Sequence, residues 1–368
     1  MSAGTNDKKA FENWIAKGFL SSLFSFRAAS VISVGFILLW LYLPSLDFYF
    51  FLDDFRTIDE SRISSLPTLV ESFSPTHYGA YYGGKAPFYR PFSTFMYFSA
   101  MKGIAGANPF YFRVVNLALF GIISLMTGKL IIDLSGDRLA AFFGATLYSA
   151  NAAHALTQHW ISCFPELIST FLVVVAFSTY VSWSRKGRAI YLAVSIGSFL
   201  LAMISKEIAV ALPGLLLLFE LLYVEPGKKK DIALVAKKIL PFAIISLLFI
   251  LFWLFFLGTR TGPYRISAGL FVLKNFALYL FSAVDGYLIG LLSVPSTDTL
   301  LRGHLAPVVA FWQTCLKFAL VVLILAWLSW KQKWDIKREI LFSLGWFIMG
   351  LGPLLFTPGR FQHYYLLF

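Results

Sequence analysis

Long apolar runs recur along almost the whole of this 368-residue chain. Hydrophobic residues make up 58% of it and charged residues 14%, whereas charged residues are about 25% of a typical soluble domain. Runs of about 18 or more apolar residues are long enough to cross a bilayer as helices, and these runs do not alternate as strands of a membrane barrel would. The sequence therefore predicts an all-α polytopic membrane protein, with about nine to eleven transmembrane helices.

The boundaries of the expected spans follow from the apolar runs and the charged loops between them. We place spans at residues 28–46, 110–132, 139–156, 165–183, 189–204, 208–224, 239–257, 308–330 and 340–356. Residues 271–294 are apolar enough to be another span, but counting them would put the basic segment 331–338 outside. Because basic loops stay in the cytoplasm, we expect 259–307 to be an external or re-entrant loop.

Basic residues are concentrated in the loops that this topology places on one side. The formal charge is +12, and both the segment 1–27 and the loop 225–238 carry several lysines. Cytoplasmic loops are enriched in Lys and Arg in this way, and such loops favour anionic membrane lipids. The charge therefore predicts no nucleic-acid partner. The two cysteines, Cys163 and Cys315, give no disulfide framework and no metal spacing.

The domain organisation is expected to be simple. Residues 1–27 form a cytoplasmic segment and 28–368 a single transmembrane domain. Residues 47–109 form a large external loop, in which 58–73 has the apolar spacing of a helix lying in the membrane interface. A further amphipathic segment runs to about Lys102. The chain stops inside what reads as the start of another apolar run, so we expect its C-terminus to be truncated.

Two adjacent acids, Asp53 and Asp54, follow the first span directly, after the aromatic residues 48–51. Aromatic residues gather where a helix leaves the bilayer, and a charge inside hydrocarbon costs several kcal/mol, so these acids lie at the membrane surface. The pair is a candidate catalytic site. The alternative is a solvated loop with two acids side by side by chance.

Further charged residues from distant parts of the chain fall on the same side of the membrane. They are Arg90 in the first external loop, Lys206 and Glu207 between the fifth and sixth spans, and Arg360 after the last. Each alone can be a loop charge or a snorkelling side chain. Together, cations beside a carboxylate suit a lipid-phosphate donor, because they neutralise a departing phosphate while the acid deprotonates a hydroxyl.

The role of the second acid stays open at this point. It could raise the pKa of its neighbour, orient it, or help to hold a divalent cation such as Mg²⁺ or Mn²⁺. Tyr89, His154 and His159 could line the site, and the two histidines with Glu166 could approach a metal, although an interfacial histidine with ordinary hydrogen bonds is the simpler interpretation. Arg113 and Asn116 share a helix face and are expected to form hydrogen bonds inside the bundle.

Several short motifs, in order, give the chain a resemblance to a known family. They are Leu52-Asp53-Asp54-Phe55, Tyr89-Arg90-Pro91-Phe92, Asn108-Pro109 with Asn116-Leu117, Ser205-Lys206-Glu207 with Pro213, and Arg360 before Tyr364 and Tyr365. This series resembles the GT-C membrane glycosyltransferases, most closely the protein O-mannosyltransferases and the tetratricopeptide-containing O-mannosyltransferases.

The resemblance implies a GT-C-like bundle that uses a polyprenyl-phosphate-linked sugar, such as dolichyl phosphate mannose, with inversion at the sugar carbon. It implies that Asp53 or Asp54 is the base, with Asp53 matching the leading acid, and that Arg90, Lys206 and Arg360 bind the donor phosphate or position the site. The enzyme would lie in a bacterial inner membrane or an ER-type membrane, with its site facing the periplasm or lumen.

The sequence also departs from the family pattern. His154 is followed by Ala155, Gly359 stands where an acid often precedes the late Arg, and tetratricopeptide repeats are absent. These departures leave the acceptor open among polypeptide, lipid and glycan. The alternative functions are a transporter or flippase of a lipid-linked substrate, whose charges should lie near the bilayer midplane, and a non-catalytic scaffold, whose external charges would tolerate substitution.

Overall fold

The computed structural model describes residues 26–51, 53–61, 63–75, 88–224, 231–256 and 337–356, with short pieces between 267 and 323. These residues form helices and their connections and contain no strand, which confirms an all-α fold. Four helical stretches are long and apolar enough to cross a membrane: Phe26–Asp47, Pro109–Ser135, Ile161–Lys186 and Ile232–Phe256. The expected total of nine to eleven spans stays a prediction.

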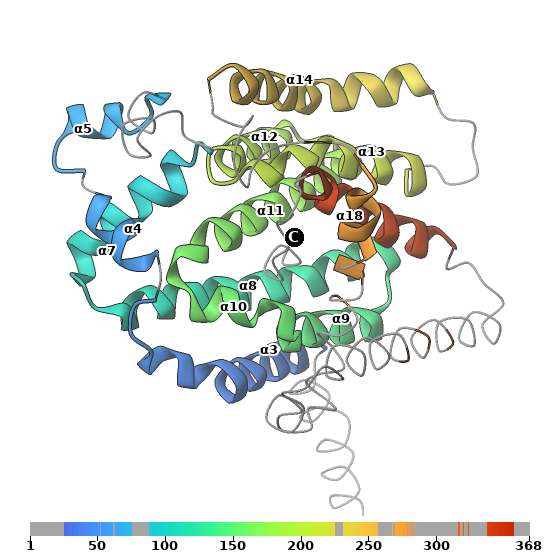
Figure 1. The fold of residues 1–368 in the computed structure, drawn as a ribbon. Helices are drawn as coiled ribbons and strands as arrows, with labels where there is room; N and C mark the ends of the chain where they lie inside the picture. The colour runs from blue at the N-terminus through green and yellow to red at the C-terminus, as the bar shows by residue number, and fades with distance from the viewer. Residues whose placement is uncertain are drawn as a thin grey trace, which may run out of the picture.

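The long helices lie side by side as a bundle (Figure 1). They are α3 (Phe26–Ile37), α8 (Pro109–Ser135), α9 (Arg138–Ala150), α11 (Phe164–Lys186), α12 (Ala189–Met203), α13 (Leu212–Leu222), α14 (Ile232–Phe256) and α18 (Lys337–Leu355). Helix α11 lies at the centre of the bundle. Of the apolar stretch that contains it, 78% is buried, against 17% of the stretch that contains α14. Helix α14 is therefore an outer helix, and many of its apolar side chains face the surroundings, as do those of the first span, which is 22% buried.

Tight glycine turns join two pairs of these helices into hairpins. Gly136 ends α8 with a φ of 74° and Gly187 ends α11 with a φ of 68°, left-handed conformations that glycine adopts without steric cost. The Asp137 carboxylate then accepts the N–H groups of Leu139 and Ala140 and caps α9. The short turn expected after the second span is therefore present, and Gly136 and Asp137 form it.

The segment 47–109, which the sequence predicts to be an external loop, contains several short helices rather than one long one. The expected helix over 58–73 is wrong: the chain forms α4 (Asp54–Glu60) and α5 (Leu66–Glu71). Ser65 begins a new helix there, because its hydroxyl and that of Thr68 form a capping box, with Pro67 in the first turn. The later amphipathic segment is present as η4 (Pro91–Met96) and α7 (Tyr97–Ala105).

The expected third span, 139–156, ends early. Helix α9 stops at Ala150, where the Asn151 side chain accepts the N–H of Ala153. Three short helices follow, η5 (Ala152–His154), α10 (Ala155–His159) and η6 (Ile161–Cys163), before α11 begins. His154 therefore lies outside a long helix, in an irregular connection that also contains His159.

Other helix boundaries also differ in detail from those expected. The first span changes from α3 to a π-helical turn η2 (Leu38–Tyr42) and a 3-10 turn η3 (Leu43–Asp47), which has Pro44 near its start. The sixth begins as a 3-10 turn, η7 (Glu207–Ala211), before α13. The expected span 308–330, apart from single positions, and Arg360 lie outside the described residues.

Of the segment 271–294, the structure describes 271–277, 279, 280 and 283, which are helical. The Asn275 amide donates to the carbonyl oxygen of Leu355 at the end of α18, over 3.1 Å. The Tyr279 side chain packs with Leu351 and Leu355. This piece therefore contacts the C-terminal end of α18, and whether the whole segment is re-entrant stays a prediction.

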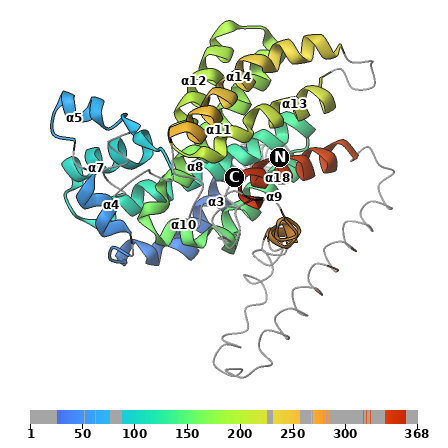
Figure 2. The same ribbon diagram turned by 45° about the horizontal axis from the view of Figure 1, so that its top comes forward.

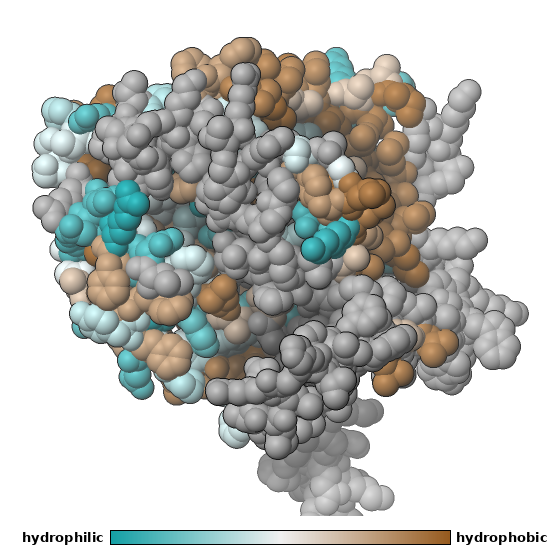
Figure 3. Space-filling model, in the orientation of Figure 1, coloured by the Kyte–Doolittle hydropathy of each residue, from teal (hydrophilic) through white to brown (hydrophobic). Residues whose placement is uncertain are grey.

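Polar and apolar residues separate on the surface. The short helices α4, α5 and α7 gather at one end of the bundle in both views (Figures 1 and 2). In the space-filling view, hydrophilic residues gather over these helices, and hydrophobic ones cover the side formed by α14 (Figure 3). Residues such as Leu248, which is 60% exposed, belong to this apolar side. An apolar flank is the surface expected of a helix bundle in lipid.

Close packing between α8 and α9 gives a first prediction. A Cβ added at Gly128 would lie 2.9 Å from the Ala141 carbonyl oxygen and 2.9 Å from the Ala145 Cβ. Gly128→Ala should therefore destabilise the fold by about 1–3 kcal/mol, although Ala favours helix more than Gly. Unfolding of the purified protein in mixed micelles measures this change.

Gly197 in α12 is the matched control, because no atom lies within 4 Å of a Cβ added there. Gly197→Ala should leave stability unchanged or raise it slightly. Equal stability of Gly128→Ala and the original protein would contradict the α8–α9 packing.

Candidate active site

Asp53 and Asp54 lie at the start of α4, where the chain turns after the first span. Asp53 is the residue before the helix, and its carbonyl oxygen accepts the N–H of Thr57 over 2.8 Å. Its side chain is exposed, whereas Asp54, the first residue of α4, is fully buried with 0% exposure. The two neighbouring acids therefore have opposite environments.

The buried Asp54 carboxylate forms the hydrogen bonds that close the site. Its Oδ2 accepts the N–H of Phe51 over 3.0 Å, and its Oδ1 accepts both the N–H and the hydroxyl of Ser162, each over 2.7 Å. Burial raises the pKa of Asp54, and these hydrogen bonds and the nearby Arg113 oppose that rise. Asp54 thus joins the loop after the first span to the connection before α11.

Arg113 of α8 is the other residue that holds these two segments together. Its guanidinium is 1% exposed and donates to four backbone carbonyls. In the loop after the first span, the acceptors are the carbonyl oxygens of Phe48, over 3.1 Å, and Tyr49, over 2.7 Å. In the connection before α11, they are those of Gln158, over 3.3 Å, and His159, over 2.8 Å. The predicted hydrogen bonding inside the bundle is confirmed for Arg113 but is wrong for Asn116, whose buried side-chain amide has no hydrogen-bond partner among the described residues.

The two histidines lie close to this framework. The His159 ring packs edge-on to Phe48 at 5.2 Å, and burial and Arg113 lower the pKa of His159. His154 is buried against Tyr148 and Phe120, and burial lowers its pKa to about 3, so its imidazole is neutral at neutral pH.

Nothing in the described part of the chain brings the histidines into a metal centre. No group of three or more His, Cys, Asp or Glu side chains is placed there to hold a metal ion. Glu166, the expected third ligand, instead pairs with Lys206. The possible site of His154, His159 and Glu166 is therefore wrong, and the described residues offer no three-residue metal cluster at Asp53 and Asp54 either.

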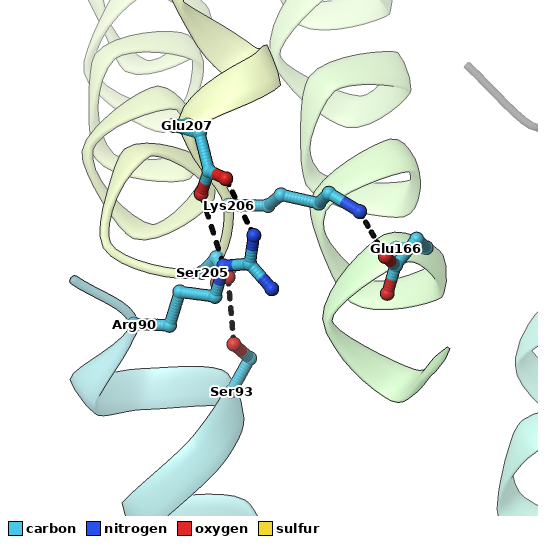
Figure 4. A network of polar contacts seen from close by, with 6 residues as sticks. All are labelled: Arg90, Ser93, Glu166, Ser205, Lys206 and Glu207. Carbon is cyan, nitrogen blue, oxygen red and sulfur yellow. Dashed lines mark hydrogen bonds and ion pairs between the residues drawn. The ribbon is translucent and has the colours of Figure 1, made fainter. Parts of the chain in front are cut away.

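A second polar network lies in the same half of the bundle, between η4, η7 and α11 (Figure 4). Arg90 donates from Nε to Glu207 Oε2 over 2.9 Å and from Nη2 to Oε1 over 2.5 Å. The adjacent Lys206, 2% exposed, forms an ion pair with Glu166 of α11. Two ion pairs therefore link the first external loop to the turn after α12 and to α11.

Hydrogen bonds complete this contact. The Ser93 hydroxyl donates to the carbonyl oxygen of Ser205 over 2.7 Å (Figure 4). The N–H of Phe92 donates to the carbonyl oxygen of Ile204 over 3.4 Å. Burial would raise the pKa of Glu207, but the charge and hydrogen bonds of Arg90 lower it to about 2. Burial lowers the pKa of Lys206, which the Glu166 carboxylate opposes.

Cys163 connects the two networks in space. Its thiol is buried, and Glu166, three residues further along the chain, pairs with Lys206. The same residue ends η6, one position after Ser162, which holds Asp54. The Asp54 network and the ion pairs are therefore two sides of one polar region.

The structure places five expected site residues in this region: Asp53, Asp54, Arg90, Lys206 and Glu207. Tyr89 lies beside it, donating its hydroxyl to the Phe73 carbonyl oxygen over 2.6 Å and packing against Phe252. Arg360, the remaining expected residue, lies outside the described residues.

Two residues of the region were missed from the sequence. Ser162 carries no motif that predicts its contact with Asp54. Glu166 was considered only as a metal ligand, although a buried lysine such as Lys206 needs a nearby acid, and this need was a usable signal.

Comparisons with known proteins add no relative: no family model matches the chain, and no characterised protein or solved structure is significantly similar to it.

The hydrogen bonds of Arg113 give a stability prediction. Arg113→Gln should lower the free energy of unfolding by about 3 kcal/mol or more, because several buried carbonyls lose their donors. Arg113→Lys should recover only part of this lost stability, because a lysine ammonium lacks the planar fork with which the guanidinium reaches both segments. Thermal or detergent-induced unfolding measures both.

Arg56→Gln is the control for this pair of variants. The Arg56–Glu60 ion pair is exposed on α4, so its loss should cost less than about 1 kcal/mol. An Arg113→Gln protein as stable as Arg56→Gln would contradict the role given to Arg113.

The Arg90–Glu207 pair predicts a specific sensitivity to acid. Because the pKa of Glu207 falls from 4.5 to about 2 in the folded protein, its stabilising effect is complete above about pH 4.5 and is lost as the pH falls towards about 2. Glu207→Gln should be less stable at neutral pH and should lose less further stability on acidification.

Unfolding curves between pH 7 and pH 2 test this, with Glu71→Gln in the exposed part of α5 as the control. Parallel pH dependences for Glu207→Gln and the original protein would show that the ion pair does not contribute.

Proposed function

We propose that this protein is a membrane glycosyltransferase of the GT-C type. It would transfer a sugar from a polyprenyl-phosphate donor to an acceptor hydroxyl, with Asp53 as the base in one inverting displacement. The observation that carries the proposal is the contrast within the acid pair: Asp53 is exposed and Asp54 is buried. A base must reach the proton it removes, and Asp53 is the acid that an acceptor can reach.

Asp54 then acts through Asp53 rather than on the substrate. Its three hydrogen bonds fix the chain at Phe51 and at the beginning of α4. This holds the backbone of the neighbouring Asp53 in place. Pre-organised geometry of this kind can supply much of the rate of a displacement, because the reacting groups are already aligned.

The ion-pair network supplies the cations that the donor needs. Lys206 pairs with Glu166, four residues after the Ser162 that holds Asp54, and Arg90 pairs with the adjacent Glu207. Arg90 presents a planar fork of N–H donors and holds Glu207 with two of its nitrogens, and we infer that the same guanidinium takes part in binding a phosphate oxygen. Positive charge at this position would stabilise the phosphate that leaves when the sugar is transferred.

The distribution of charges along the bundle favours an enzyme over a transporter. A transporter is expected to hold its functional charges near the bilayer midplane. The polar region described here instead lies at the end of the bundle that carries α4 and η4 (Figure 1). We infer that this end faces the periplasm or lumen, since the basic turns at Arg138 and Arg185 lie at the opposite helix ends.

Sugar transfer by membranes carrying single variants tests this function. With a labelled polyprenyl-phosphate sugar as donor, Asp53→Asn should lower the transfer rate by about a hundredfold or more, the typical contribution of a general base. Its unfolding curve should match that of the original protein, since the Asp53 side chain is exposed. Asp54→Asn should lower both stability and transfer.

Asp47→Asn is the matched control, because Asp47 is an exposed acid at the end of the same span. Its transfer rate should be unchanged. Sugar transfer at the full rate by Asp53→Asn would show that Asp53 is not the base. If the original protein transferred no sugar from such donors, the proposed reaction would be wrong.

A further inference from the structure

A groove lies at the other end of the bundle, away from the acids. It is bounded by α8, α11 and α18 and has a volume of about 440 Å³, within the range of ligand sites in proteins. Its walls are mainly apolar and include Leu130, Val174, Phe342 and Trp346. None of Asp53, Asp54, Arg90 and Lys206 lines it.

The groove follows the helix axis and lies at membrane depth. Along α8 it extends from Ile123 to Ser135, which at 1.5 Å per residue is about 18 Å. Both α8 and α11 belong to the helices long and apolar enough to span a membrane. A long apolar groove between two such helices fits an occupant that is apolar over the same length.

One end of the groove is polar and lies beside basic residues. Ser135, Tyr223 and Glu339 line it there. The Arg338 guanidinium lies 4.7 Å above the Tyr223 ring and donates to Glu339 over 2.7 Å. Arg185 reaches the same end, where it donates to the carbonyl oxygen of Asp133 over 2.6 Å.

We propose that the groove binds one membrane phospholipid with an anionic head group. One acyl chain would lie along α8 from Ser135 towards Ile123, and the phosphate would lie at the basic end beside Arg338 and Arg185. The proposal follows from the combination of an apolar groove with a polar end, where Glu339 lines the groove and the guanidinium groups of Arg338 and Arg185 lie beside it. Such a groove matches an amphiphile with its charge at one end. It is independent of the proposed sugar transfer.

Native mass spectrometry of the delipidated full-length protein tests this site. The probes are dioleoylphosphatidylglycerol and dioleoylphosphatidylcholine, added in equal amounts. We expect one phosphatidylglycerol to be retained per chain, in preference to phosphatidylcholine. Ser343→Trp, which fills the groove, should reduce retention at least fivefold, and Arg338→Ala should reduce the preference for phosphatidylglycerol.

Leu344→Trp is the control, because Leu344 is the next residue of α18, is 49% exposed and does not line the groove. It should retain lipid like the original protein, and unfolding curves should show that all variants fold. Equal retention by Ser343→Trp and Leu344→Trp would overturn the site. Equal binding of the two lipids would overturn the charge selectivity, and retention of an added polyprenyl phosphate in place of phosphatidylglycerol would overturn the occupant.

Discussion

The hydrogen bonds of one buried arginine hold the polar end of this bundle together. Arg113 donates to carbonyl groups from two segments that are far apart in the sequence, the loop after the first span and the connection before α11. Asp54 joins the same two segments from the other side through Ser162. A buried charge that donates four hydrogen bonds to two segments fixes its neighbours strongly, because an unpaired buried group is costly. The exposed position of Asp53 depends on this framework.

The ion pairs extend the framework to the rest of the external loop. Arg90 with Glu207 and Lys206 with Glu166 bring η4, η7 and α11 together. Removing either residue of a pair would leave the other as an uncompensated buried charge. Ion pairs therefore stabilise this region in addition to apolar packing. The bundle therefore has a polar end with the acids and a basic end with the groove, connected by long apolar helices.

The sequence predicted the helices better than it predicted the contacts between them. Apolar runs located α8, α11 and α14 to within a few residues, apart from the N-terminal part of α14, because burial in lipid requires such runs. The same pattern missed the break at Asn151 and the new helix at Ser65, where a side chain bonded to the backbone overrides apolar periodicity. The sequence identified Asp53 and Asp54 as a candidate pair but could not separate their roles. Those roles depend on contacts with Ser162 and Arg113, which are distant in the sequence and belong to no motif.

The most direct test of the account is carboxyl labelling of the two acids. Membranes carrying the protein would be treated with a carbodiimide and an amine nucleophile, and peptides covering 47–61 would be analysed by mass spectrometry. The account predicts modification of Asp53 in step with loss of sugar transfer, while Asp54 stays unmodified until Arg113 is replaced. Equal modification of both acids, or modified Asp53 in protein that still transfers sugar at its full rate, would contradict it.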